Sequence, residues 1–322
     1  MLLPAGFIDG GRVYGETLRR ALYASTAGAT GVVRSDDLRV VALATPGPAV
    51  VISPGAGVIA TRYTDADPGQ SYSVSVGAAL TLPVPANNTP STRTWHVIIR
   101  VTDPQYVGES VPDDPEDATY TVAELVATLP TTRPFLHLAT LRVPANTGVV
   151  VPSAIEDTRR IAQPRSVRLL RAFDIPADSR NRVMDWNGDY RAFSAAVSRF
   201  VDVPEWATEV HAKVDWQSLV APVGWNVSQF TVRFGGGAGE PSPVFLNPTT
   251  LVVGSPAAQT NSLEERRMNI GVSGSWRIPP AWRGRRITVA GDARRAQGNM
   301  ALHLDLWSSA SIDLQFTETA QQ

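Results

Sequence analysis

The stretch Glu209-Val-His-Ala-Lys-Val-Asp-Trp216 decides the fold class, because apolar and polar side chains alternate along it at every step. Its even-numbered residues are all apolar and fall on one face of an extended chain, since successive side chains of a strand point to opposite sides. The same alternation recurs at residues 230–234, 268–278, 302–306 and 312–316. One apolar and one polar face is typical of antiparallel sheets packed face to face. We therefore predict a β-sandwich in the C-terminal half.

The N-terminal half predicts a second all-β domain that begins with one helix. Tyr14, Leu18 and Leu22 recur every four residues, which predicts a helix over about residues 12–26. Asp9 is its expected N-cap, and Gly28 or Gly31 its expected end. Short β-branched runs separated by Gly and Pro follow at residues 38–43, 49–52, 72–76, 95–101, 119–127, 135–143 and 148–151. No helices alternate with these runs, so we expect an antiparallel sandwich rather than a parallel α/β sheet.

The chain is expected to divide near residues 155–168. Its 322 residues suit two domains of roughly 150 each. The composition also changes there, because Trp95 is the one tryptophan that precedes this segment, out of eight in the chain. We predict an N-terminal domain over 1–160, a linker over 161–168 and a C-terminal sandwich over 169–322.

The composition argues against several classes of partner. Charged residues make up 18% of the chain and the net charge is −1, so a general attraction to nucleic acid or anionic membrane is not expected. There is no cysteine, which excludes disulfides. No uncharged apolar stretch reaches the ~18 residues of a membrane span. The N-terminus lacks the pattern of a signal peptide, so we expect synthesis in the cytoplasm and export, if any, within a released particle.

The sequence contains no assembled catalytic or metal-binding motif. The glycine pattern at 54–60 is not followed by the helix that a dinucleotide site needs, and the glycines at 235–239 lack the Lys-Ser/Thr of a phosphate loop. The four histidines are isolated in the sequence, and no Gly-x-Ser-x-Gly elbow occurs. We therefore expect a protein that is not an enzyme and has no metal or cofactor. A glycosidase is the remaining alternative, because it needs only two suitably spaced carboxylates.

Three tryptophans lie in turn-like sequence contexts and are candidate contact residues. They are Trp186 in Asp-Trp-Asn-Gly, Trp225 in Gly-Trp-Asn and Trp282 in Pro-Ala-Trp-Arg-Gly. An exposed Trp ring stacks on the C–H face of a sugar, so these residues are candidates for contact with glycan or a protein partner. Core packing is the alternative, since Trp is mostly buried on average.

Arginines crowd the segment between the predicted domains. Because the Arg fork matches carboxylates, these residues are candidates for an ion-paired subunit interface, with solvent-exposed or intrachain roles as the alternative. The acidic loop at 103–117 is the candidate partner. The residues singled out are Arg159, Arg160, Arg165 and Arg168, with Asp113 and Asp114.

Three segments of the N-terminal half resemble a known family. They are Arg100-Val-Thr-Asp-Pro-Gln-Tyr106, Leu138-Ala-Thr-Leu-Arg-Val-Pro-Ala145 and Ile155-Glu-Asp-Thr-Arg159. Their order after the predicted helix resembles the N-terminal attachment module of minor tail or baseplate proteins from long-tailed phages that infect actinobacteria. The resemblance covers roughly residues 1–160.

This resemblance implies a virion structural protein that is made in the host cytoplasm. Its N-terminal module would dock on other proteins of the tail tip, as part of a homotrimer, and its C-terminal domain would face outward. That domain resembles a jelly roll or a carbohydrate-binding module at the level of pattern, so host cell-wall glycan is a candidate ligand. The alternatives are a tail-associated cell-wall hydrolase or esterase, and a bacterial surface glycan-binding protein unrelated to phage.

Overall fold

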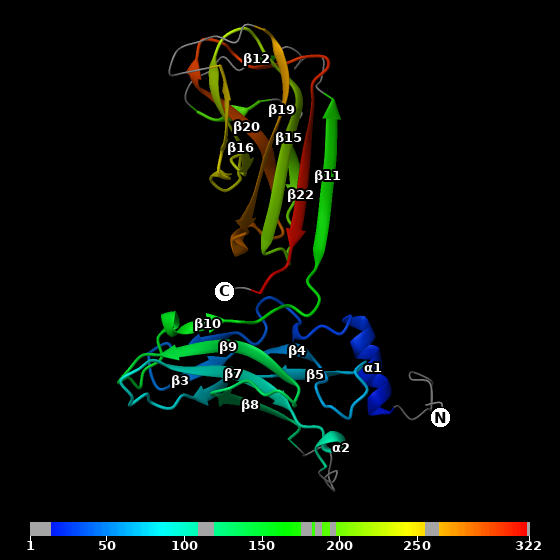
Figure 1. Cartoon of the computed structure of the whole chain (residues 1–322), viewed down its shortest axis with the longest axis vertical. Coiled ribbons are helices and arrows are strands. Elements are labelled where there is room, and N and C mark those ends of the chain that lie inside the picture. The colour runs from blue at the N-terminus through cyan, green and yellow to red at the C-terminus, as the bar shows by residue number, and fades with distance from the viewer. Residues whose placement is uncertain are drawn as a thin grey trace. The chain divides into compact units, whose positions relative to one another are not determined.

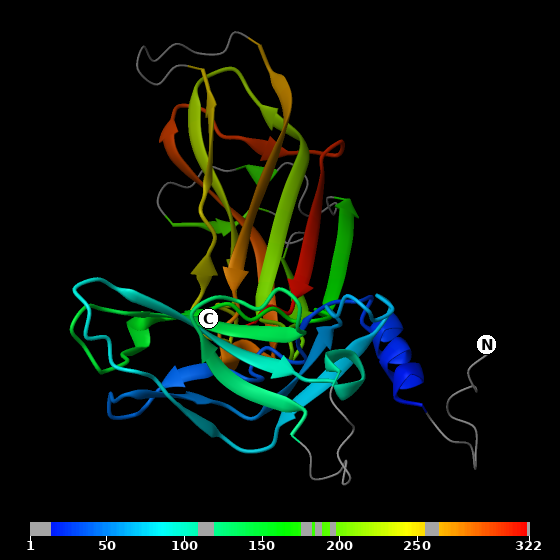
Figure 2. The same cartoon turned by 60° about the horizontal axis from the view of Figure 1, so that its bottom comes forward.

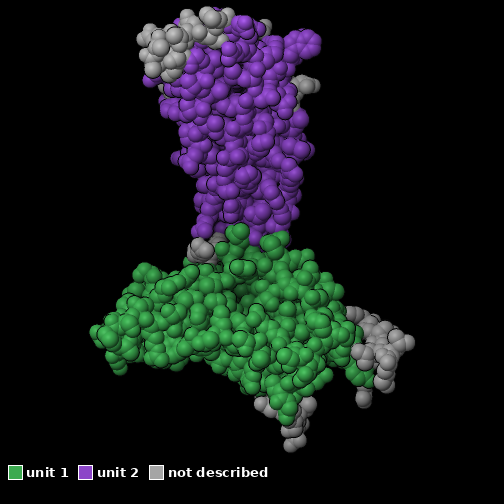
Figure 3. Space-filling view, viewed as in Figure 1, with its two compact units in different colours: residues 1–164, 319–322 green, residues 165–318 purple. Residues whose placement is uncertain are grey.

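The computed structural model describes residues 14–108, 119–174, 182–183, 189–193, 198–254 and 264–320 (Figure 1). In these ranges the chain is all-β, with one helix of more than one turn near the N-terminus, as the sequence predicts. It divides into unit 1, residues 1–164 with 319–322, and unit 2, residues 165–318 (Figure 3). No helix in the described ranges is long and apolar enough to cross a membrane.

The linker predicted at 161–168 includes residues 166–168, which belong to a strand of unit 2. The two units divide between Pro164 and Arg165. Strand β11, Ser166–Asp174, then begins at once and pairs with β22, Ser309–Thr317, from Ser166 opposite Thr317 onward. Residues 166–168 are therefore strand, because their backbone takes part in this ladder.

The described part of unit 1 contains helix α1, the single-turn helix α2 and three small sheets. Its elements are α1 Gly15–Ser25, β1 Gly31–Val32, β2 Val40–Ala42, β3 Ala49–Ile52, β4 Gly55–Ala60, β5 Ser71–Val76, β6 Leu80–Pro83, β7 Arg93–Val101, α2 Pro104–Val107, β8 Thr121–Val126, β9 Phe135–Val143, a 3-10 turn at Pro152–Ala154 and β10 Ile155–Asp157. The sheets have the orders β1-β4-β5, β2-β3-β6 and β10-β9-β7-β8. Val97, Ile99 and Val101 alternate along β7 and face the core of the unit. Figure 2 shows its blue-to-green strands, with α1 at one edge.

Two local expectations in unit 1 are corrected. Helix α1 begins at Gly15 with Tyr14 as its N-cap, so the expected cap at Asp9 is wrong. Gly28 follows the helix end with a φ of +71° and donates its N–H to the carbonyl of Tyr23, at 2.9 Å. The run 148–151 is not a strand, since Val150 makes only an isolated bridge, with Gly47.

Unit 2 is a jelly roll. Its elements are β11, β12 Arg182–Val183, β13 Arg191–Ala192, β14 Ser198–Asp202, β15 Glu209–Ala221, β16 Asn226–Phe234, β17 Val244–Phe245, β18 Thr249–Val253, β19 Arg266–Arg277, a 3-10 turn at Pro280–Trp282, β20 Arg286–Gly298, β21 His303–Leu304 and β22. One sheet runs β11-β22-β15 with β19 on the far side of β15, and the other runs β14-β20-β16-β18. The first and last strands are neighbours and the chain passes repeatedly between the sheets, which is the jelly-roll topology.

The apolar faces of the two sheets form one core. Trp216 of β15 is fully buried and lies 5.2 Å, between ring centroids, from Phe230 of β16. Gly291 of β20 leaves the space that Trp216 fills, because a Cβ there would lie 2.6 Å from the indole ring. The alternation that predicted the fold class is therefore the alternation of core-facing and outward-facing residues.

Candidate functional site

The three tryptophans predicted as contact residues have different surroundings. Trp282 is only 6% exposed, and its ring lies 4.8 Å from that of Trp276 in an edge-to-face contact. Trp282 is therefore a core residue, which was the alternative, and not a contact residue, because its ring packs against Trp276 of β19 and lies close to Gly235. Trp225 is half-buried, and its backbone N–H donates to Asn299 Oδ1 at 2.8 Å. Trp186 lies outside the described residues.

The arginines between the predicted domains are largely occupied within the chain. The side chain of Arg159 is fully buried and pairs with Asp157 at 2.6 Å, so it is not a subunit-interface charge. Arg165 pairs with Glu318 at 2.7 Å and Arg168 with Asp313 at 2.5 Å, although both guanidinium groups face solvent. The side chain of Arg160 is exposed. Asp113 and Asp114 lie outside the described residues, so their pairing stays a prediction.

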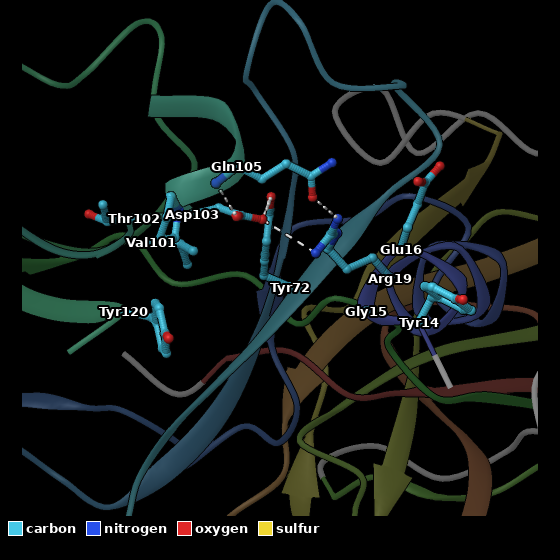
Figure 4. Close-up of a pocket in the computed structure, with 11 residues that line it drawn as sticks. Tyr14, Gly15, Glu16, Arg19, Tyr72, Val101, Thr102, Asp103, Gln105 and Tyr120 are labelled. Carbon is cyan, nitrogen blue, oxygen red and sulfur yellow. Dashed lines mark hydrogen bonds and ion pairs between the residues drawn. The ribbon is translucent and has the colours of Figure 1, made fainter. Parts of the chain in front are cut away.

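A pocket of about 710 Å³ opens beside α1 in unit 1 (Figure 4). Helix α1 contributes Tyr14, Glu16 and Arg19 to its lining, and Tyr72 of β5 forms part of the opposite side. The segment that follows β7 adds Asp103 and its neighbours. Residues 101–105, which belong to the first segment that resembles the attachment module, therefore line this pocket together with the helix.

Arg19 is at the centre of a polar network in the pocket. Its Nη1 lies 3.3 Å from Asp103 Oδ2, and its Nε donates to Gln70 Oε1 at 2.6 Å. The hydroxyl of Tyr72 also donates to Asp103, at 2.9 Å. Asp103 in addition caps α2 by accepting the backbone N–H of Gln105. This network ties α1 to β5 and to the end of β7.

The protonation state of Tyr72 suits its place in this network. Burial, followed by the adjacent Asp103 carboxylate, raises the pKa of Tyr72 above its ordinary value. The phenol therefore stays protonated and keeps donating to Asp103. The carboxylate in turn accepts from Tyr72 and Gln105 and pairs with Arg19. Among the residues that line the pocket, Tyr14 has an exposed aromatic ring.

The sequence did not single out the most exposed large apolar side chain in the described parts, which is Trp307 at 74% exposure. It follows Leu306, 55% exposed, in the turn between β21 and β22. The run 302–306 was predicted as a strand with Leu306 facing inward, and that is wrong because the strand ends at Leu304. A turn signal was present in Asp305-Leu-Trp-Ser308, where Asp and Ser flank the two apolar residues.

Hydrogen bonds from three segments fix this turn. The N–H of Ser308 donates to the carbonyl of Asp305 at 3.1 Å, and the N–H of Trp307 donates to Asp305 Oδ1 at 3.0 Å. The Ser308 hydroxyl donates to the carbonyl of Ser218 in β15, at 2.9 Å. Arg267 of β19 forms a two-pronged pair with the Asp305 carboxylate and holds the pKa of that carboxyl down at about 2. We call residues 305–308 the Trp307 turn.

Two histidines that are isolated in the sequence lie side by side in unit 1. Nδ1 of His96 on β7 is 3.2 Å from Nε2 of His137 on β9, and Nε2 also lies 3.1 Å from the carbonyl of Ala139. Burial lowers the pKa of His137, which favours the neutral ring. No group of three or more metal-ligating side chains occurs among the residues described. The pair therefore forms a hydrogen-bonded contact between two strands.

Comparisons with known proteins give no family assignment. No protein-family model matches the chain, and no characterised protein matches it in sequence. A structure of infectious bursal disease virus, Gx strain, is 12% identical, with 92% of this chain and 81% of that one covered and a TM-score of 0.25. A family 22 carbohydrate binding module of Clostridium thermocellum Xyn10B is 16% identical, with 49% and 86% covered and a TM-score of 0.21. At these TM-scores neither similarity carries an argument about this chain.

Proposed function

We propose that this chain is a virion structural protein of a phage tail tip or baseplate and not an enzyme. It attaches to other tail-tip proteins through unit 1, as part of a homotrimer, and presents the unit 2 jelly roll to tail proteins or to glycan of the host surface. It is made in the host cytoplasm and acts in the assembled particle.

The observation that carries this proposal is the set of contacts that the three segments resembling the attachment module make within unit 1. Asp103 of the first segment binds Arg19 of α1. In the second, the carbonyls of Val143 and Pro144 accept the side-chain amide of the buried Asn87. Arg159 of the third donates from Nη1 to the backbone carbonyl of Asp37, at 2.6 Å. Each segment joins parts of unit 1 that are far apart in the sequence, so residues that resemble the attachment module help to hold the unit together.

Helix α1 supplies the surface for attachment in this proposal. It has no buried residue, and Tyr14 and Leu18 are exposed to 49% and 45%. Arg19 meanwhile fixes the orientation of the helix through Asp103. An ordered helix with an apolar exposed stripe beside a pocket is suited to dock against a partner protein.

The proposal is tested by incorporation into particles. Phage that encode the full chain are purified, and mass spectrometry measures its amount relative to the tail-tube protein. Leu18→Glu should abolish incorporation, because it places a charge in the docking surface. Leu170→Glu is the matched control, since Leu170 is equally apolar and 55% exposed but lies in unit 2. Absence of the wild-type chain from particles, or equal incorporation of both variants, would contradict the proposal.

A further inference from the structure

The Trp307 turn places a large apolar side chain in solvent at a fixed position. Trp307 is 74% exposed, and a Trp side chain can bury roughly 150–250 Å² on contact with a partner. A tryptophan has only two side-chain torsions to fix, so little conformational entropy is lost on binding. An exposed Trp on a rigid support is therefore an anchor of the kind that dominates binding energy.

The support of the turn comes from groups that are themselves held in place. Ser218 of β15 lies at an irregularity in the pairing of β15 with β19 and has a φ of +57°. Its carbonyl accepts from Ser308, and its N–H donates to Asn269 Oδ1 at 2.8 Å. Asp305 is fixed by Arg267 from β19. The turn is thus ordered before any ligand arrives, which lowers the entropy loss on binding.

Polar groups that can bind hydroxyls surround the base of the turn. Gln217 precedes Ser218 and is exposed, and Asn269 is exposed on the neighbouring strand. The hydroxyl of Ser309, the next residue after the turn, lies 3.5 Å from Gln217 Oε1. A side-chain amide carries both a donor and an acceptor, as a pair of sugar hydroxyls requires.

This combination decides between classes of ligand. A sugar ring has an apolar C–H face for the indole and hydroxyls at its rim for the amides. A membrane would need a broader apolar surface than Leu306 and Trp307 provide, or a basic patch, whereas the guanidinium of Arg267 beside the turn is neutralised by Asp305. A hot spot for a protein partner is surrounded by contacts that exclude water. Exposed side-chain amides lie beside this turn instead, so a protein partner is less favoured than a saccharide.

We propose that Trp307, together with Gln217 and Asn269, forms a carbohydrate-binding platform at the Trp307 turn of unit 2. The ligand class is a neutral saccharide chain, with one ring stacked on the indole and its hydroxyls bonded to the two amides. The inference deepens the proposed function, on which it rests for taking unit 2 as the unit that meets the host surface.

The experiment measures binding of the full chain to a printed array of neutral α- and β-linked oligosaccharides, and titrates the best of them by calorimetry. Wild type should bind at least one saccharide, and Trp307→Ala should weaken that binding by about tenfold or more. Trp307→Tyr should restore much of it, because a ring is kept. Phe200→Ala is the matched control, since Phe200 is 65% exposed in unit 2 but lies on β14, and it should bind like wild type.

Binding of wild type to no saccharide, or undiminished binding by Trp307→Ala, would overturn the inference. Phosphatidylcholine vesicles form a second arm, and Trp307-dependent binding to vesicles without saccharide binding would overturn it as well. The outcome is independent of incorporation into particles. If Trp307→Ala loses saccharide binding while the chain is missing from virions, only the proposed function fails. If the chain is in virions and the variant binds normally, only this inference fails.

Discussion

Loss of Arg159 should destabilise unit 1 more than loss of an exposed ion pair does. The buried guanidinium lies 2.6 Å from Asp157 and donates to the carbonyls of Ser35 and Asp37, at 3.1 and 2.6 Å. Arg159→Ala would leave a carboxylate with 16% exposure and two carbonyl oxygens without this donor. Removing one partner of a buried pair costs about 3–5 kcal/mol. A domain of this size loses about 2–4 °C per kcal/mol, so the melting temperature of unit 1 should fall by roughly 6–20 °C.

The assay is differential scanning calorimetry of the full chain, in which the transition of unit 2 serves as an internal reference. Arg142→Ala is the matched control, because Arg142 pairs with Glu156 at 2.9 Å but both side chains are more than half exposed. Exposed pairs contribute about 0–1 kcal/mol, so this control should lower the melting temperature by at most about 4 °C. A shift for Arg159→Ala no larger than that of Arg142→Ala would refute the reasoning.

Two further predictions concern unit 2. Trp282→Ala should destabilise it by about 3–5 kcal/mol, because the ring is buried against Trp276. Trp307→Ala should change its stability by less than about 0.5 kcal/mol, because that ring is exposed. Urea denaturation followed by circular dichroism measures both free energies of unfolding, and equal losses would contradict the burial described. The pKa of Asp305 is lowered from 3.8 to about 2, chiefly by its hydrogen bond with Arg267, so the charged pair contributes stability that is complete above pH 3.8 and is lost as the pH falls toward 2. The melting temperature of unit 2 should therefore fall over this range more steeply in wild type than in Asp305→Asn, and parallel curves would count against the pair.

The strands of unit 2 could be predicted where each core-facing position carries an apolar side chain and each outward-facing position a polar one. Along β15, every core-facing residue from Val210 to Trp216 is apolar, so the period of two is plain in the sequence. β20 escaped prediction although its 13 residues form the centre of the opposite sheet. Its core-facing positions include Gly291, which is small because Trp216 occupies the space above it. A residue such as Gly291, whose size is set by a side chain on another strand, does not contribute to the local period-two pattern of apolar residues.

Which turn tryptophan is exposed could not be predicted from the sequence. Trp282 and Trp307 both lie in short turns between strands, and local sequence does not separate them. Trp282 is buried because Trp276 of β19 and Gly235, which follows β16, lie against its ring. A Cβ at Gly235 would lie 2.7 Å from that ring. Trp307 stays exposed because the polar groups of its turn bond inward and leave its ring outside. Burial of a turn residue depends on tertiary contacts, which a single sequence does not contain.

The central claim is that this chain belongs to the tail tip of a phage particle. Its most direct test is electron microscopy of purified particles labelled with a gold-conjugated antibody against the full chain. We predict label at the free end of the tail and none on the capsid. Particles without label, or label confined to the capsid, would contradict the account.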